Sequence, residues 1–175
     1  MNHINKLNMI VAFCKNRGIG NHNIIPWYIP DDFKQFKNIT SREKNSGIVM
    51  GKNTWLSLPR KPLKNRENII LSSTLSYSEV KKYDNIKIFS KKDELDDYLA
   101  KKKEPSWIIG GENIYNQYIT HKNLNKIFVT YIDKQFECDT FFPELPEHFE
   151  LKYSSEKKIN DDYYYQYQMY KNINI

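Results

Sequence analysis

The stretch SWIIGGENIY, residues 106–115, joins a run of apolar residues to a Gly-Gly pair and then to a segment of helical character. A short apolar run bounded by polar residues and glycine is typical of a buried β-strand. Gly110 and Gly111 let the backbone approach a ligand closely, and the free N–H groups that begin a helix favour phosphate. Glycine is also common at such junctions for structural reasons alone, and the pair lacks the G-x-G-x-x-G pattern of dinucleotide sites. The stretch therefore predicts a strand followed by a helix and leaves its ligand open.

The same alternation of strand and helix continues on both sides of this stretch. We expect further strands at 9–13, 47–51, 68–73, 86–89 and 126–132, and helices at 31–40, 52–58, 92–102 and 112–119. Because parallel strands need crossover connections, this alternation favours a mostly parallel sheet. Residues 149–159 and 163–171 alternate around a polar turn at 160–162, which predicts a C-terminal antiparallel hairpin. With no visible boundary or linker, we predict a single α/β domain over residues 1–175.

Composition and the N-terminal residues exclude several classes of protein. Hydrophobic residues make up 39% of the 175 residues, yet no apolar run approaches the ~20 residues that a membrane helix needs. The start, MNHINKLNMIVAF, has neither the basic and apolar regions of a signal peptide nor the Arg/Ser-rich pattern of a transit peptide. We therefore expect a cytoplasmic protein, or one in an equivalent viral or endosymbiont setting, with no membrane partner.

Cysteine usage points away from a disulfide framework and from a metal centre. The two cysteines, Cys14 and Cys138, lie far apart and have no Cys or His neighbours at metal-ligand spacing. We expect no metal site, and we expect both thiols to be small buried or half-buried groups.

The positive charge of the chain allows two interpretations. A net charge of +6 can attract nucleic acid, but the lysines are scattered or form short runs such as KKK at 101–103. A nucleic-acid-binding face would be clustered, so we expect no nucleic-acid partner. A basic surface equally suits a small polyanion such as a phosphorylated cofactor or a polycarboxylate.

The stretch IIPWYIPDDFKQF, residues 24–36, contains the beginning of a helix. Pro30 suits the first turn, where Asp31 or Asp32 would serve as an ordinary capping carboxylate beside free N–H groups. Apolar residues at three-residue spacing then predict a buried stripe, which comprises Phe33, Phe36 and Ile39.

A functional interpretation of the same stretch starts from Trp27, which is held between Pro26 and Pro30 in a loop that otherwise needs no such rigidity. If Asp32 points inward, with Phe36 one turn further on, its carboxylate lies beside an aromatic wall and burial raises its pKa. Such a carboxylate can hold a planar, amidine-like ring by two parallel hydrogen bonds and assist proton transfer to it.

Two other predicted strands end in groups that can bind phosphate. VMGKNTW, residues 49–55, places Lys52 and Thr54 near the beginning of a helix, and ILSS, residues 70–73, ends in two hydroxyls. Each group alone is compatible with an ordinary surface residue. Because the carboxyl ends of parallel strands share one edge of the sheet, together with Gly110 and Gly111 they suggest one extended anionic cofactor.

These stretches together resemble dihydrofolate reductases. PWYIPDDFKQFK, VMGKNTWLSLPRKPLKNRENIILSS, WIIGGENIY, VTYID and CDTFFP occur in the order and rough spacing of that family, and GIGNHNIIPW resembles its flexible active-site loop. The resemblance implies a dihydrofolate-reductase-like central eight-stranded sheet with flanking helices. It also implies the reduction of dihydrofolate to tetrahydrofolate by NADPH, a reaction that supports thymidylate and one-carbon metabolism and is inhibited by antifolates.

The resemblance also implies roles for single residues on the substrate side. Asp32 matches the acidic residue that binds the pterin and favours protonation of its N5, Trp27 would support the water between them, and Thr130 would be linked to the carboxylate. Arg66 would pair with the α-carboxylate of the substrate's glutamate, for which a guanidinium fork suits better than lysine. The pterin and p-aminobenzoyl groups would lie against Ile10, Phe36, Leu58 and Leu63. The backbone carbonyls of Ile10 and Ile109 would accept the 4-amino group of an antifolate.

For the cofactor, the resemblance implies contacts along the whole of NADPH. Ala12 and Ile19 would contact the nicotinamide carboxamide, and Tyr115 would lie close to the same end. The pyrophosphate would be cradled by Gly110, Gly111, Glu112 and Ile114, with a cis Gly110-Gly111 peptide. The adenosine phosphates would be bound by Lys52, Thr54, Ser72, Ser73 and Lys91.

The loop from Lys15 to Tyr28 is expected to be a moving lid that can limit product release. Asp139 resembles the acidic residue that bonds this lid in some members of the family, although it can equally be a simple turn cap. Ile25 stands where the family usually has Met or Leu, and its β-branched side chain is stiffer.

The alternatives are the NADPH-dependent pyrimidine reductase of riboflavin synthesis, which shares the fold, a non-catalytic binder of folate or NADPH, and a basic nucleic-acid-binding protein. Asp32, Trp27 and Arg66 argue against the first. We expect a monomer.

Overall fold

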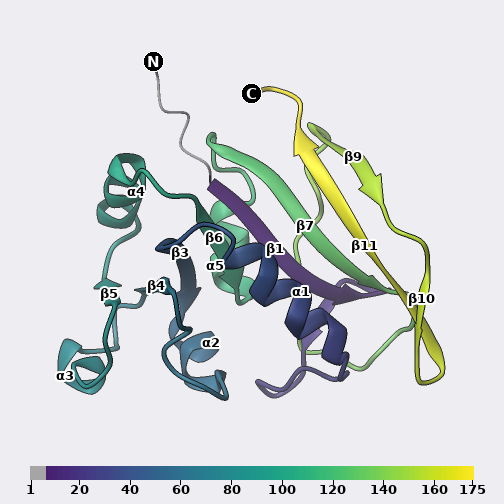
Figure 1. The fold of residues 1–175 in the computed structure, drawn as a ribbon, viewed down its shortest axis with the longest axis horizontal. Helices are drawn as coiled ribbons and strands as arrows, with labels where there is room; N and C mark the ends of the chain where they lie inside the picture. Colours follow the sequence, from purple (N-terminus) through teal and green to yellow (C-terminus); the bar gives the residue numbers. More distant parts are fainter. Residues whose placement is uncertain (1–6) are drawn as a thin grey trace.

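The computed structural model describes residues 7–175, and residues 1–6, on which part of the argument against a targeting signal rests, lie outside this range. A twisted sheet forms the centre of the molecule (Figure 1). The strands of this sheet are β1 (Leu7–Cys14), β3 (Ser46–Gly51), β4 (Arg66–Leu71), β5 (Ile86–Phe89), β6 (Ser106–Gly110), β7 (Leu124–Ile132), β9 (Phe149–Ser154), β10 (Lys158–Asn160) and β11 (Tyr163–Asn172). A separate small sheet pairs β2 (Gly18–Gly20) with β8 (Thr140–Phe141).

The order across the central sheet is β10-β11-β7-β1-β6-β3-β4-β5, and β9 pairs with the far end of β11. Because β9 and β10 share one position beside β11, the described part of the chain forms eight strand positions. The pairs from β7 to β5 are parallel, whereas β11 runs antiparallel to β7, β9 and β10. This confirms the predicted eight-stranded, mostly parallel sheet with a C-terminal antiparallel hairpin.

Helices cover both faces of the sheet. They are α1 (Pro30–Thr40), α2 (Lys52–Ser57), α3 (Tyr77–Val80), α4 (Lys92–Lys101) and α5 (Glu112–Tyr118). Figure 1 shows α1 in front of the sheet and α5 behind it. Side chains alternate along β1, so Met9 and Val11 face the α5 side while Ile10 and Ala12 face the α1 side.

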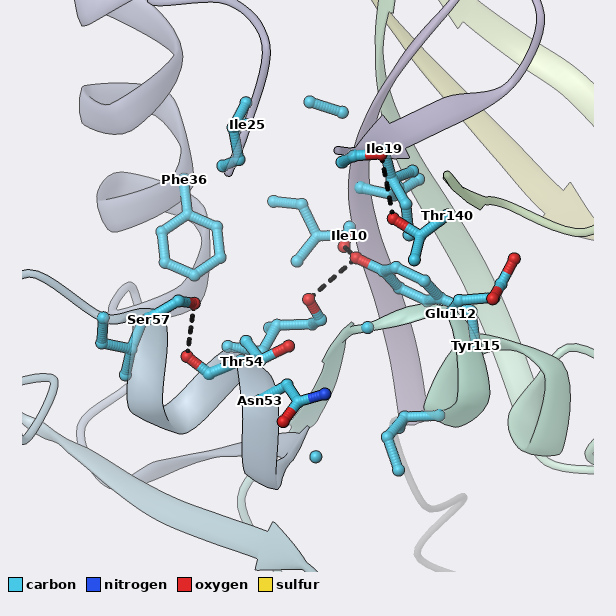
Figure 2. A pocket seen from close by; sticks show the side chains of 18 of the residues that line it. Ile10, Ile19, Ile25, Phe36, Asn53, Thr54, Ser57, Glu112, Tyr115 and Thr140 are labelled. Atoms are coloured by element: carbon cyan, nitrogen blue, oxygen red, sulfur yellow. Dashed lines mark hydrogen bonds between the residues drawn. The ribbon is translucent and has the colours of Figure 1, made fainter. Parts of the chain in front are cut away.

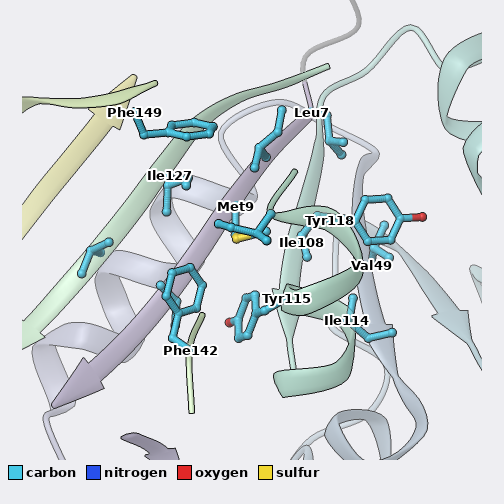
Figure 3. Close-up of a cluster of buried hydrophobic side chains, with 14 of the residues drawn as sticks. Leu7, Met9, Val49, Ile108, Ile114, Tyr115, Tyr118, Ile127, Phe142 and Phe149 are labelled. Atoms are coloured by element: carbon cyan, nitrogen blue, oxygen red, sulfur yellow. The ribbon is translucent and has the colours of Figure 1, made fainter. Parts of the chain in front are cut away.

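The largest core cluster lies between the sheet and α5. Figure 3 shows Met9, Ile108 and Ile127 from three neighbouring strands packed against Tyr115 and Tyr118 of α5. These side chains are at least 96% buried. The core therefore fixes the position of α5 relative to the carboxyl ends of the strands.

The structure corrects three details of the sequence interpretation. The predicted buried stripe on α1 is wrong for Phe33, which is 51% exposed, because the stripe faces a cavity rather than packed side chains. The C-terminal hairpin strand is interrupted between β9 and β10, with an irregular register at Met169/Tyr170. The short helix α3, whose Ser76 and Glu79 form a capping box, was not predicted.

Residues 7–175 also bear on the predictions about membrane helices and cysteines. Within residues 7–175, no helix is long and apolar enough to cross a membrane. Cys14 is buried and Cys138 is half-buried, and neither is in a disulfide, as predicted.

Candidate functional site

A cavity of about 1070 Å³ opens at the carboxyl ends of the parallel strands. Residues that directly follow β3, β4, β5 and β6 line it, together with α1 and the loop after β2. In Figure 2, Thr54 of α2 and Glu112 at the beginning of α5 lie on opposite sides of this cavity. Pockets for one small molecule have volumes of roughly 300–1,000 Å³. The cavity is therefore large enough for two ligands side by side.

Asp32 is the acidic group at the α1 side of the cavity. The helix begins at Pro30, and Asp32 in its first turn does not cap it. Its carboxylate instead accepts a hydrogen bond of 2.5 Å from the hydroxyl of Thr130 on β7, 98 residues further along the chain. Burial raises the pKa of Asp32, and the Thr130 hydrogen bond opposes part of that rise. The half-buried carboxylate is thus poised to bind or shift a proton in the cavity.

This raised pKa predicts that Asp32 lowers stability at neutral pH. The folded protein holds the proton more tightly than the unfolded chain, so stability falls as the pH rises from the ordinary pKa of 3.8 through the folded value. We expect Asp32→Asn to melt at or above the wild-type temperature at pH 7, with the difference vanishing at low pH. Thr130→Val is the control, because it removes the donor and leaves the charge, and it should melt lower at pH 7. A clearly lower melting temperature for Asp32→Asn would contradict the assigned burial.

Trp27 also lines the cavity. It is 8% exposed, and its ring packs against Phe136 with centroids 5.5 Å apart. The loop between Pro26 and Pro30 therefore places a buried indole in the wall of the cavity.

Tyr115 forms the floor of the cavity between β1 and β6. Its hydroxyl lies 2.8 Å from the carbonyl oxygens of both Ile10 and Ile109, as Figure 2 shows for Ile10. Burial first, and then the charge of Asp32, raises the pKa of Tyr115, so the phenol remains a donor at neutral pH. The two carbonyls that the resemblance assigns to ligand binding thus converge on one point.

The Gly110-Gly111 peptide is cis, as the resemblance implies. Gly110 has φ +111, and a Cβ there would lie 2.8 Å from the Tyr115 ring. A Cβ on Gly111 would instead point into the gap toward the hydroxyl of Thr54, at 3.5 Å. The second glycine therefore keeps open the space between α2 and α5.

Hydroxyl and ammonium groups surround the opposite end of the cavity. Lys52 donates to the hydroxyl of Thr74 at 3.2 Å, and the Ser72 hydroxyl accepts the backbone N–H of Thr74 at 3.2 Å. Ser73 also lines the cavity, whereas Lys91 does not. Lys91 is exposed, and its two neighbours, Ser90 and Lys92, line the cavity in its place.

Arg66 lies at the amino end of β4, beside the apolar part of the cavity. It is 5% exposed, and its guanidinium donates to the hydroxyl of Thr40 at 2.9 Å and to the carbonyl of Lys64 at 3.1 Å. The guanidinium carbon lies 5.8 Å from the centre of the Phe36 ring. These contacts hold the fork rigidly where it lines the cavity.

The remaining predicted site residues are divided by whether they line the cavity. Of all the predicted site residues, those that do not line the cavity are Lys91 and Gly110. Those that line it beyond the residues already described are Ala12, Ile19, Leu58, Leu63, Glu112 and Ile114.

The lid loop is attached to the segment that carries Asp139. The Asp139 carboxylate accepts the backbone N–H of His22 at 2.9 Å, and the Thr140 hydroxyl donates to the carbonyl of Gly20 at 3.2 Å. Asp139 therefore contacts the lid rather than capping its own turn.

Sequence reasoning missed several residues of the cavity wall. Lys37 and Arg60 add positive charge to the lining, and Tyr153, Tyr167 and Met169 come from the C-terminal hairpin. Lys37 lies four residues after Phe33 on the same face of α1, so its place on the helix was a usable signal. The hairpin residues carried no such signal, because only the packing of α1 over the sheet brings them to the cavity.

The fold and the cavity define an α/β protein with a cavity at the carboxyl ends of its parallel strands, where the half-buried carboxylate of Asp32 lies on the α1 side. A family model described as Dihydrofolate reductase matches residues 6–172. The dihydrofolate reductase of Heliothis virescens is 34% identical over 181 residues, covering 96% of this chain and 98% of the relative. That of Gallus gallus is 38% identical over 157 residues, covering 81% and 80%. The viral dihydrofolate reductase of Saimiriine herpesvirus 2 (strain 488) is 40% identical over 152 residues, covering 79% and 69%. The chain belongs to the dihydrofolate reductase family and is an oxidoreductase of that family.

Proposed function

We propose that this chain reduces 7,8-dihydrofolate to 5,6,7,8-tetrahydrofolate with NADPH. The observation that carries the proposal is the Asp32 carboxylate, which faces the cavity, is held by Thr130 at 2.5 Å and has a raised pKa. A carboxylate in this position can accept two parallel hydrogen bonds from the amidine-like edge of a pterin.

The residues at the opposite end of the cavity fit a phosphorylated dinucleotide. Gly111 leaves open the gap toward Thr54, and Lys52, Ser72 and Ser73 supply donors along the same wall. We infer that these groups bind the phosphates of NADPH, that Gly110, Gly111, Glu112 and Ile114 surround the pyrophosphate, and that Ala12, Ile19 and Tyr115 bound the nicotinamide end. Bound there, NADPH would supply the hydride for reduction of the pterin at C6.

The residues of the chain position the substrate and help to protonate it. Asp32 would hold the pterin and favour protonation at N5 through a water that Trp27 supports. Ile10, Phe36, Leu58 and Leu63 would pack on the pterin and p-aminobenzoyl rings and exclude water from the reacting atoms. The carbonyls of Ile10 and Ile109 would accept the 4-amino group of antifolates.

The test of the reaction is the oxidation of NADPH with dihydrofolate, followed by near-ultraviolet absorbance. Turnover of dihydrofolate supports the proposal. A folded protein that binds NADPH but leaves dihydrofolate unchanged would overturn the substrate assignment and favour a sequestering protein or a pyrimidine reductase.

The assigned role of Arg66 predicts a defect in substrate binding. Charge-assisted hydrogen bonds are worth about 1.5–3 kcal/mol each, so Arg66→Leu should raise KM for dihydrofolate by about 10–100-fold, with a much smaller change in kcat. The KM of Arg66→Lys should lie between those of the wild type and Arg66→Leu, because lysine keeps the positive charge but lacks the guanidinium fork.

The matched control for this prediction is a substrate rather than a variant. A dihydropteroate that lacks the glutamate should show the same KM with the wild type and with Arg66→Leu. Equal losses with both substrates would mean that Arg66 acts only by holding Thr40 and Lys64 in place.

We further propose that the protein acts as a single-domain monomer in the cytoplasm, where its product would serve thymidylate and one-carbon metabolism. Lys91 stays a predicted contact of the adenosine phosphates, and we place Lys92 and Ser90 beside it, since these two line the cavity.

A further inference from the structure

Glu112 connects the cavity to β8, the strand that pairs with the lid, through one hydrogen bond. It is the first residue of α5 and lines the cavity, but its carboxylate points out of it and accepts the backbone N–H of Phe141 at 2.9 Å. Figure 2 shows Glu112 on the same side of the cavity as Thr140. Phe141 belongs to β8, which is 29 residues further along the chain.

β8, which Glu112 contacts through Phe141, is also the strand that pairs with the lid. β8 pairs with β2, which matches Gly18 with Phe141 and Gly20 with Thr140. The residue before β8, Asp139, accepts the N–H of His22 at 2.9 Å and donates its own N–H to the carbonyl of Gly20 at 3.0 Å. A shift of β8 would therefore move the contacts that hold the lid at Gly20 and at His22.

A charge at Glu112 has a cost when an anion binds beside it. The pyrophosphate that the proposed function places at Gly111 would lie next to the residue that follows Gly111 in the chain. Like charges at short range repel strongly where water is partly excluded. The N–H of Phe141 offsets part of this repulsion by holding the carboxylate away from the cavity.

We propose that Glu112 is a positioning residue that couples the binding of the dinucleotide pyrophosphate to the position of the lid. Binding of the anion strengthens the preference of the carboxylate for Phe141 and so fixes β8 and the lid anchors. By reciprocity, a lid that is anchored on β8 favours binding of the dinucleotide. This inference rests on the proposed function, because it takes NADPH as the ligand.

The experiment compares Glu112→Gln, which keeps the acceptor oxygen and removes the charge, with Glu112→Ala, which removes both. The dissociation constant of NADPH is measured by quenching of tryptophan fluorescence, and protection of the Phe141 amide by hydrogen exchange with and without NADPH. Reduced nicotinamide mononucleotide, which lacks the pyrophosphate, is the comparison ligand. Glu144→Gln is the control variant, because it removes a charge that pairs with Arg17 of the lid in an exposed ion pair, while Glu144 does not line the cavity.

In the wild type we expect NADPH, but not the mononucleotide, to increase protection of the Phe141 amide. Glu112→Gln should bind NADPH about 3–10-fold more tightly, bind the mononucleotide unchanged, and show a smaller gain in protection. In Glu112→Ala the amide should exchange rapidly with or without NADPH, and Glu144→Gln should behave as the wild type.

A double-mutant cycle separates coupling from a local effect. Asp139→Ala should weaken NADPH binding in the wild type but have at least about threefold less effect in Glu112→Ala. The inference would be overturned if Asp139→Ala changed the dissociation constant of NADPH by the same factor, within about twofold, in the wild type and in Glu112→Ala. It would also be overturned if Glu112→Gln bound both NADPH and the mononucleotide with wild-type affinity. A wild type that does not quench with NADPH would instead overturn the proposed function.

Discussion

Replacing Asp32 by asparagine should lower kcat for dihydrofolate reduction by about 10²–10⁴-fold at pH 7, the range of a lost acid–base group. Asparagine can still accept the Thr130 hydrogen bond, but it can neither hold a negative charge against the pterin nor favour a proton at N5. The loss should grow as the pH rises, because the variant depends on substrate that solvent has already protonated. At low pH, where such substrate is plentiful, the variant should recover part of its rate.

The matched control is Asp31→Asn. Asp31 occupies the same first turn of α1, but its carboxylate pairs with the exposed Lys34 at 3.2 Å and does not line the cavity. We expect this variant to keep its rate within about twofold at every pH, because an exposed pair of this kind contributes little. Measurement of kcat from pH 5 to pH 9 for the three proteins decides the matter. A pH profile of Asp32→Asn that runs parallel to that of the wild type would refute a role in protonation.

Gly110→Ala should be the most damaging single-methyl substitution at the site. Its φ of +111 is a conformation that L side chains rarely adopt, and the added Cβ would lie 2.8 Å from Cε2 and 3.0 Å from Cζ of Tyr115. Such backbone strain costs about 1–3 kcal/mol, and overpacking of a buried ring costs about 1–3 kcal/mol more. We expect the melting temperature to fall by about 5–20 °C. The displaced Tyr115 hydroxyl would leave the carbonyls of Ile10 and Ile109, and activity would fall with it.

Gly111→Ala adds the same methyl group one residue later and should behave differently. Its φ is −81, and the added Cβ would meet only the Thr54 hydroxyl, at an ordinary contact distance of 3.5 Å. We expect nearly wild-type melting but NADPH binding weakened on the order of tenfold, because the methyl enters the space that the dinucleotide needs. Calorimetry and fluorescence quenching on both variants test the pair. Equal melting temperatures for the two alanine variants would contradict the close packing of Tyr115 on Gly110.

Much of the candidate site was predictable because it is built from strand ends. Lys52, Ser72 and Gly111 each directly follow a strand, Thr54 lies two residues after Lys52, and parallel strands bring such residues to one edge of the sheet. Lys91, which only the resemblance implied, shows the limit of transferring single positions, because one residue of register at the beginning of α4 decides which of two lysines faces the cavity. Periodicity cannot place a helix boundary to one residue.

Phe33 shows a second limit. Three-residue spacing correctly indicated one face of α1, but the pattern does not distinguish a face that packs on a core from a face that lines a cavity. The coupling of Glu112 to Phe141 was equally invisible, because β2 and β8 are only 3 and 2 residues long. Strands this short carry no alternation that a sequence pattern can register.

The sequence by itself determined the architecture, because alternating buried strands and helices allow few arrangements other than a mostly parallel sheet. The order and spacing of its motifs also indicated the family. The helix-capping pattern left Asp31 and Asp32 equivalent and only the family resemblance pointed to Asp32, whereas the tertiary structure supplied the physical reason for the difference. Successive residues of a helix point about 100° apart, so one carboxylate turns toward solvent and Lys34 while the other turns toward Thr130. Which of them does so depends on how α1 lies over β7, and that is fixed by packing between residues far apart in the chain.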